Sequence, residues 1–262
     1  MTPRRRVLLA LAALAPVMVA ALGPALAPHA EDAVVGAPLS AHSAFGTDFL
    51  GRDVASRVLR GGGELLLTAA IAAVAGTAAG AALGLVAAVR GGWLGALLER
   101  VTEVLVVIPA VLVLLLFGTT SRDPGPLVLG AVLAVLAVPW VARVVAAAAD
   151  RLMGSGFVEH ALATGERTWW IVSREVAPNL QATLLTLLGL RFVEAVYLVA
   201  AAAFFQVGPR PPEANWALMV RENAPGLLLN PWATALPSLA IAGVAIGVTL
   251  ACDRGWPGRA PA

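Results

Sequence analysis

The residues whose types and spacing could do chemistry are few, and the clearest pair is Arg191 and Glu194. They stand three positions apart in an otherwise apolar stretch, so on a helix they lie one turn apart and can form an ion pair. A charge near the centre of a bilayer costs at least about 2.5–3.5 kcal/mol on insertion scales, and pairing lowers this cost. Two interpretations stay open: a switch or pathway element, and a structural pair that faces a partner subunit.

Other kinds of catalytic or ligand-binding site lack the residues they need. All 18 basic residues are arginines, which excludes the lysine of a Walker A phosphate loop and Schiff-base chemistry on lysine. The single cysteine, Cys252, cannot form an internal disulfide or a cysteine metal cluster. The three histidines show no His-x-x-x-His spacing, so we expect no metal site, and no catalytic constellation is visible. A net charge of +2 does not favour nucleic acid as a partner.

The composition indicates which elements position these residues. Hydrophobic residues make up 59% of the 262-residue chain and charged residues 13%, whereas charged residues are about 25% of a soluble domain. A soluble fold of this composition would expose large apolar patches, and the apolar content also excludes disorder. We therefore expect an all-α polytopic membrane protein.

A membrane-spanning helix needs about 20 predominantly apolar residues, and six stretches of the sequence qualify. Pro109 and Pro237 lie inside the third and sixth stretches, where neighbouring helices are expected to satisfy the freed carbonyl groups. The six expected spans are Val7–Ala27, Leu65–Val89, Leu97–Phe117, Leu127–Ala149, Leu184–Val207 and Trp232–Cys252.

The first stretch has two interpretations. Arg4–Arg6, an apolar run and the sequence Ala25–Ala27 together resemble a secretory signal with its cleavage site. However, the apolar run is about 20 residues, whereas a signal core has about 7–15. Pro28 would also follow the cleavage point directly. These features favour a retained membrane helix.

The arginines near the ends of the spans predict the orientation. With the N-terminus inside, ten arginines fall on inner segments and six on outer segments, while Arg143 and Arg191 fall within helices. Six spans then place both termini in the cytoplasm. We divide the chain into an anchor helix with an extracytoplasmic loop (1–64), a five-helix core (65–253) that contains the inner loop at residues 150–183, and a short cytoplasmic tail (254–262).

The inner loop at residues 150–183 predicts a helical elbow. A helix over Phe157–Ala163 is expected to break at Gly165, and a second helix is expected to end before Pro178. The residues alone leave two interpretations open. The elbow could project into the cytoplasm, or it could lie on the lipid surface, which the adjacent Trp169–Trp170 would suit.

This elbow resembles the EAA loop of permease subunits from ATP-binding-cassette (ABC) importers. The family pattern is Glu-Ala-Ala, a later glycine and a hydrophobic-x-Pro ending. Here His160 replaces the second-position alanine, and Ala177 replaces a common leucine. The resemblance implies that the elbow is the coupling helix that docks in a groove of the ATPase subunit. The matching residues are Glu159, Ala161, Gly165, Ile171, Val176, Pro178 and Asn179.

Two outer segments resemble one branch of these importers, which transports dipeptides, oligopeptides or nickel. One segment lies between the first two spans, and the other precedes the last span. The stretch Val199–Gln206 departs from the branch's acidic pattern, so residues that line the path there cannot be carried over. The matching residues are Gly46, Thr47, Asp48, Gly51, Arg52, Asp53, Ser56, Arg57 and Gly61 in the first segment, and Gly208, Pro211, Pro212, Trp216 and Met219 in the second.

A ladder of small residues in the second span predicts a helix–helix interface. Gly76, Gly80 and Gly84 recur every four residues, and Thr68 and Ala72 extend the same ladder. Such ladders let two helix backbones approach closely in a membrane. The partner helix is expected either within the bundle or in a second permease.

The resemblance implies the partners and the cargo. It implies a second, homologous permease, two ATP-binding subunits in the cytoplasm, an extracytoplasmic substrate-binding protein and membrane lipid. ATP and magnesium would bind to the partner chains, so this chain would hold no cofactor and would not be an enzyme. Peptides are the expected cargo, with nickel chelates, haem and opines open. From another class, a secondary transporter could use Arg191 and Glu194 as an ion switch.

Overall fold

The structure is a computed structural model that describes residues 3–41, 43–90, 92–121 and 124–254. Within these ranges the regular secondary structure is helical, and β-type backbone pairing is limited to two isolated bridges. The helices are α1 (Pro3–Leu26), α2 (Val54–Arg60), α3 (Gly63–Arg90), α4 (Gly92–Val107), α5 (Ala110–Thr120), α6 (Pro126–Met153), α7 (Gly156–Ala163), α8 (Thr168–Ile171), the π-helix η1 (Val172–Val176), α9 (Ala177–Asn179), α10 (Gln181–Phe204), α11 (Trp216–Asn223), the 3-10 helix η2 (Ala224–Gly226) and α12 (Trp232–Arg254).

The all-α membrane architecture is confirmed. Four stretches of the described chain are long and apolar enough to cross a bilayer, and the bent pair of α4 and α5 gives a fifth. Within α1, Ala15–Leu26 forms a shorter apolar helix. The first expected span, the total of six and the division at residue 64 therefore stay predictions, and residues 255–262 of the expected tail lie outside the described residues. The four stretches are Val54–Val89, Pro126–Met153, Gln181–Phe204 and Trp232–Cys252.

The third expected span is not one helix. It breaks between α4 and α5, and the two pieces are bent by 76°. The break falls at Pro109, which has no N–H to donate and disfavours the helical conformation of Ile108 before it. By contrast, Pro139 lies inside α6 and Pro237 inside α12 without ending either helix.

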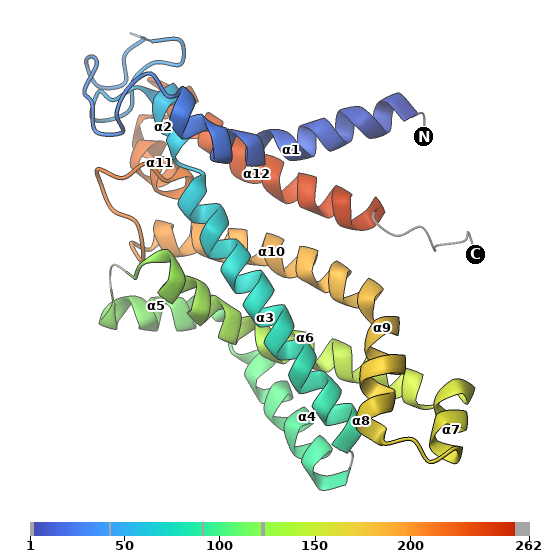
Figure 1. The fold of residues 1–262 in the computed structure, drawn as a ribbon. Helices are drawn as coiled ribbons and strands as arrows, with labels where there is room; N and C mark the ends of the chain where they lie inside the picture. The colour runs from blue at the N-terminus through green and yellow to red at the C-terminus, as the bar shows by residue number, and fades with distance from the viewer. Residues whose placement is uncertain (1–2, 42, 91, 122–123, 255–262) are drawn as a thin grey trace.

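The helices place the loops at one end of the molecule and the elbow at the other (Figure 1). The central helix α3 packs along α6 and also contacts α10. Helix α1 lies beside α12. The long loops gather around α2 and α11, whereas α7 and α8 lie at the opposite end, away from these loops. This arrangement separates two candidate functional regions by the length of the bundle.

The predicted glycine ladder lies against α6 of the same chain. A Cβ atom on Gly80 would come within 2.5 Å of the Val141 Cβ atom, and one on Gly84 within 2.6 Å of the Ala142 carbonyl oxygen. A Cβ atom on Gly76 would also collide with α6. The ladder therefore packs on a helix of the same bundle, which is one of the two partners considered for it.

Candidate functional site

The two long loops fold together into a single layer, residues 27–62 and 205–231, which we call the loop layer. The side-chain amide of Asn230 joins its two parts, because Nδ2 donates to the carbonyl oxygens of Phe45 at 3.0 Å and Thr47 at 2.9 Å. The predicted motif between the first two spans therefore packs on the segment before the last span.

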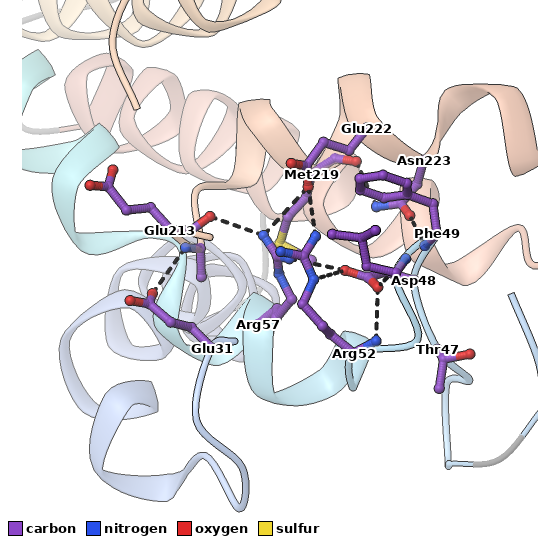
Figure 2. Close-up of polar contacts among 12 residues, drawn as sticks. Glu31, Thr47, Asp48, Phe49, Arg52, Arg57, Glu213, Met219, Glu222 and Asn223 are labelled. Atoms are coloured by element: carbon purple, nitrogen blue, oxygen red, sulfur yellow. Dashed lines mark hydrogen bonds and ion pairs between the residues drawn. The ribbon is translucent and has the colours of Figure 1, made fainter. Parts of the chain in front are cut away.

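The centre of the loop layer is Asp48 (Figure 2). Its Oδ2 accepts from Arg52 Nε at 2.6 Å and from Arg57 Nη1 at 2.9 Å. Its Oδ1 accepts from the backbone N–H groups of Leu50 at 2.9 Å and Arg52 at 2.8 Å. All three charged side chains are almost completely buried. One carboxylate thus binds two guanidinium groups and also fixes the conformation of its own loop through two backbone N–H groups.

Glu222 of α11 completes this arrangement from the other part of the loop layer. Arg52 Nη2 donates to Glu222 Oε2 at 3.1 Å, and Arg57 Nη2 lies 3.5 Å from the same oxygen. Arg57 Nη2 also donates to the Glu213 carbonyl oxygen at 2.9 Å. The residues Asp48, Arg52, Arg57 and Glu222, which we call the ion cluster, comprise two acidic and two basic side chains.

Burial sets the protonation of Glu222. Desolvation raises the pKa of its carboxyl to about 7, and the charge of Asp48 acts in the same direction, while Arg52 and Arg221 act against it. Its Oε1 is buried without a hydrogen-bond partner in the described part of the chain. Glu222 is therefore a carboxyl group that changes protonation near neutral pH.

Two glycines of the predicted motif have backbone conformations that side chains rarely adopt. Gly46 has a φ of 73°, and Gly51 has a φ of 80°. A Cβ atom on Gly51 would lie 2.2 Å from the Gly36 carbonyl oxygen, and one on Gly46 would lie 2.5 Å from Asn230 Nδ2. These glycines are needed for the turn that presents Asp48.

Asp53 and Thr47 fix the same turn through hydrogen bonds. Asp53 is the N-cap of α2, and its Oδ2 accepts from Ser56 N–H at 3.0 Å. Burial raises the pKa of Asp53, but hydrogen bonds from Ser56, Ser43 and His29 outweigh it and lower the pKa overall. Thr47 Oγ1 donates to the Ala37 carbonyl oxygen at 2.6 Å. Both residues therefore contribute to loop structure.

Sequence reasoning missed Glu222 and Asn223, which hold the loop layer together. The Phe49 N–H donates to Asn223 Oδ1 at 2.9 Å. One sequence signal was available, because Asn215 is a typical N-cap residue before an apolar turn. Its side chain accepts from the N–H of Ala217, so it begins α11. Recognising α11 would have placed both residues on a helix in the outer loop.

At the other end of the molecule, the elbow begins with α7 and turns at Gly165. Gly165 has a φ of 83°. Its N–H donates to the Leu162 carbonyl at 3.0 Å, and the Glu166 N–H donates to the Ala161 carbonyl at 3.1 Å. This pair of bonds is a Schellman motif, which satisfies the last carbonyl groups of a helix. No described atom beyond its chain neighbours lies within 4 Å of a Cβ atom built on Gly165, so the turn lies in open space.

The second half of the elbow differs from the prediction that it ends before Pro178. Helix α8 continues through the π-helix Val172–Val176 into α9, and only Leu180 separates α9 from α10. Pro178 cannot donate a backbone hydrogen bond, but it does not end the helical structure, because the wider π turn precedes it. The side-chain amide of Asn179 donates to the Glu175 carbonyl at 2.6 Å. The elbow is thus connected to α10 by helical structure.

The elbow has a buried face and an exposed face. Val158, Ala161 and Ile171 are buried in a cluster with Val145 of α6. On the exposed face, the structure gives the Glu159 and His160 side chains no partner in the part of the chain that it describes. Exposed apolar side chains of the same elbow give it a surface that another protein or lipid could cover. They are Phe157, Leu162, Trp169 and Trp170.

Arg191 and Glu194 form an ion pair on α10, as their spacing predicts. Both side chains are half-buried, and the Arg191 guanidinium carbon lies 5.9 Å from the centre of the Trp140 ring. The pair borders a cavity of about 230 Å³ that is also lined by Ile108 and Pro109. The charged pair therefore lies beside the break between α4 and α5.

These features define the class of protein. It is a polytopic α-helical membrane protein with a structured loop layer at one end and a helical elbow at the other. Within the described ranges, no group of three or more His, Cys, Asp or Glu residues could hold a metal ion. Residues 80–254 match the family described as the binding-protein-dependent transport system inner membrane component, and the chain belongs to this family of ABC importer permeases.

Individual relatives cover most of the chain. The glutathione transport system permease protein GsiD of Pectobacterium atrosepticum is 29% identical over 78% of this chain and 67% of its own length. The probable D,D-dipeptide transport system permease protein DdpC of Escherichia coli is 28% identical over 82% of this chain and 72% of its own length. A putative peptide transport system permease protein of Brucella suis is 32% identical over 80% of this chain and 70% of its own length. Family membership decides against the secondary-transporter alternative.

Proposed function

We propose that this chain is the non-catalytic permease subunit of an ABC importer for peptides. A second, homologous permease would complete the translocation path, and an extracytoplasmic substrate-binding protein would deliver the cargo. Two ATP-binding subunits would bind ATP and magnesium, so this chain would hold no cofactor. The relatives named for dipeptide, peptide and glutathione transport support peptides over nickel chelates or haem.

The observation that carries the coupling role is the geometry of the elbow. Glu159, His160 and the turn at Gly165 are exposed, and the space beside Gly165 is open. The buried face of the elbow packs on α6, and its second half leads through helical structure into α10. A protein bound to the exposed face could therefore move two membrane helices at once.

The proposed orientation follows from the separation of the two ends. The loop layer would face the extracytoplasmic side, and the elbow would face the cytoplasm with both termini. The inner excess of arginines supports this orientation, since positive residues favour the cytoplasmic side. In Figure 1 the start of α1 and the end of α12 lie away from the loop layer, in agreement with the proposal. The chain would reside in the cytoplasmic membrane.

Gly165→Trp tests the coupling role. Tryptophan at a φ of 83° is strained, and its ring would fill the open space next to the elbow. We expect the variant to insert and to pair with the second permease. It should lose the ATP-binding subunits, or keep them without stimulation of hydrolysis by substrate. The measurements are co-purification of the ATP-binding subunits and ATP-driven uptake in proteoliposomes.

Gly125→Trp is the matched control, because Gly125 also has nothing within 4 Å and begins α6 at the opposite end. This variant should retain its ATP-binding subunits and its uptake. Wild-type uptake with full retention of the ATP-binding subunits in the Gly165→Trp protein would refute the coupling role of the elbow.

A further inference from the structure

A polar cavity lies at the edge of the loop layer, separate from the ion cluster. It has a volume of about 570 Å³ and opens between the end of α5 and the segment that follows α10. This volume lies within the range of about 300–1,000 Å³ that is typical of small-molecule sites. None of the four ion-cluster residues lines it. Its polar side chains are Thr119, Gln206, Arg210 and Arg221.

Among the described residues, two arginines and no carboxylate line this cavity. Glu222 forms its ion pairs with Arg52 and Arg57, and it acts on Arg221 through its charge without a described hydrogen bond or ion pair between them. The Nη1 atom of Arg221 is buried, and it has no hydrogen-bond partner in the described part of the chain. A buried N–H group without an acceptor is energetically unfavourable. An anion in the cavity would supply the missing acceptor.

The cavity wall is held in an unusual backbone conformation. Gln206, which lines the cavity, has a φ of 65°, which is rare for a residue with a side chain. Helix α5 packs closely on this segment, because a Cβ atom on Gly118 would lie 2.3 Å from Val207 Cγ2. Such strained residues occur at ligand sites where packing holds them in place.

We propose that this cavity binds the carboxylate of a small solute, and that for a peptide cargo it binds the terminal carboxylate. The planar guanidinium group of Arg221 can donate two parallel hydrogen bonds to a carboxylate, and Arg210 adds a second positive charge. In the proposed orientation, cargo released on the extracytoplasmic side would meet this site before it reaches the charged pair on α10. The peptide assignment rests on the proposed function, whereas carboxylate binding does not.

The first experiment measures the charge of the cavity. Cysteine replaces Thr119, an exposed lining residue, in a Cys252→Ser background, and the assembled importer is placed in phosphatidylcholine liposomes. Anionic sulfonatoethyl and cationic trimethylammonioethyl methanethiosulfonates then compete for the thiol. We expect the anionic reagent to react faster. Arg221→Gln should lower the ratio of the two rates about tenfold.

Arg60→Gln is the control, since Arg60 lies in the loop layer but does not line the cavity. Its rate ratio should equal that of the parent protein. If Arg221→Gln yields too little complex, Arg210→Gln at the exposed position gives the same comparison. An unchanged ratio in the variants of both lining arginines overturns the proposal.

The second experiment tests the ligand through protection of the same cysteine. Millimolar dialanine should slow modification at least threefold, and dialanine amide, which lacks the carboxylate, should not. Arg221→Gln should abolish the protection, and Arg221→Lys should weaken it. Equal protection by the two compounds, or none by dialanine, overturns the proposal. Protection only when phosphatidylglycerol replaces phosphatidylcholine would instead assign the site to a lipid phosphate.

ATP-driven uptake of dialanine in the same vesicles separates this inference from the proposed function. Protection without uptake would leave the carboxylate site standing and count against peptide import. Uptake without protection would leave peptide import standing and overturn the site.

Discussion

Arg52 Nη2 lies 3.1 Å from Glu222 Oε2, although the two residues are 170 positions apart in the sequence. Their side chains are 2% and 4% exposed, so the contact joins the two parts of the loop layer out of contact with water. Removing one partner of a buried ion pair leaves an uncompensated charge, which costs more than the pair contributes. The ion cluster therefore makes the fold of the loop layer depend on every one of its members.

Asp48→Asn should destabilise the loop layer more than any exposed substitution. The change leaves Arg52 and Arg57 with one carboxylate between them, and the expected loss is about 3–5 kcal/mol. A lower Tm of the purified complex and a smaller amount of this complex in the membrane would show the loss of stability. Asp32→Asn, an exposed position in the same layer, is the control and should leave both unchanged. Equal Tm values for the two variants would contradict the structural role of Asp48.

Stability should fall as the pH rises toward neutrality, because of Glu222. Burial raises the pKa of this carboxyl from 4.5 to about 7 in the folded protein. Between these values the folded state holds a proton that the unfolded state has released. The free energy of unfolding therefore decreases with rising pH in this window and levels off above it, by at most about 1.4 kcal/mol per pH unit. Melting curves from pH 5 to 8 should show this slope, and Glu222→Gln should flatten it. An identical slope in Glu222→Gln would refute the assignment.

Gly80→Val should disrupt the packing of α3 on α6. The added Cβ atom would meet the Val141 Cβ atom at 2.5 Å, and overpacking of this kind costs about 1–3 kcal/mol. Size-exclusion chromatography in mild detergent should show less monodisperse complex. Ala79→Val at the exposed neighbouring position is the control and should resemble the parent. A monodisperse Gly80→Val complex with the parent's Tm would show that this contact can relax.

The charged pair on α10 should respond as a unit. Arg191→Leu or Glu194→Leu alone leaves an unpaired charge at membrane depth and should reduce the amount of assembled complex. The double variant should restore assembly. A restored but inactive double variant would assign the pair to the pathway, and additive losses would contradict the pairing. Glu103→Leu, which breaks the exposed pair with Arg100 at 3.0 Å, should have little effect.

The orientation predicts which positions an impermeant maleimide can reach in intact cells. In a Cys252→Ser background, cysteines at Asp32 and Leu228 should react, since both are exposed in the loop layer. A cysteine at Glu166, which is exposed on the elbow, should react only after the cells are permeabilised. Labelling of residue 166 in intact cells would invert the topology.

The sequence predicts those parts of the structure that depend on local physics. Apolar runs indicate the membrane helices, and Gly165 ends α7 because a glycine readily adopts the positive φ of that turn. The spacing of Arg191 and Glu194 places them one helical turn apart. Each of these inferences uses residues that are close together in the chain.

Features that depend on distant partners could not be predicted in this way. Pro109 breaks its helix whereas Pro139 does not, and a missing N–H group is common to both. The local signal is therefore the same at both prolines and does not distinguish them. Glu222 reads as a solvated residue of an outer loop until the fold brings it to Arg52 and Arg57. The contacts of Glu222 join residues far apart in the chain, and local patterns do not encode them.

The break at Pro109 has a consequence for the hydrogen bonding of α5. With 11 residues, α5 is about 16 Å long, too short to cross the hydrocarbon core by itself. The N–H groups of Ala110 and Val111 begin this helix without intrahelical acceptors, and no side chain caps them. Lipid chains cannot hydrogen-bond to these groups, so water or protein must reach them wherever the helix end is out of contact with the aqueous phase. The cavity beside the break is lined by Ala110 as well as by Arg191 and Glu194, so water in this one cavity would solvate both the start of α5 and the charged pair.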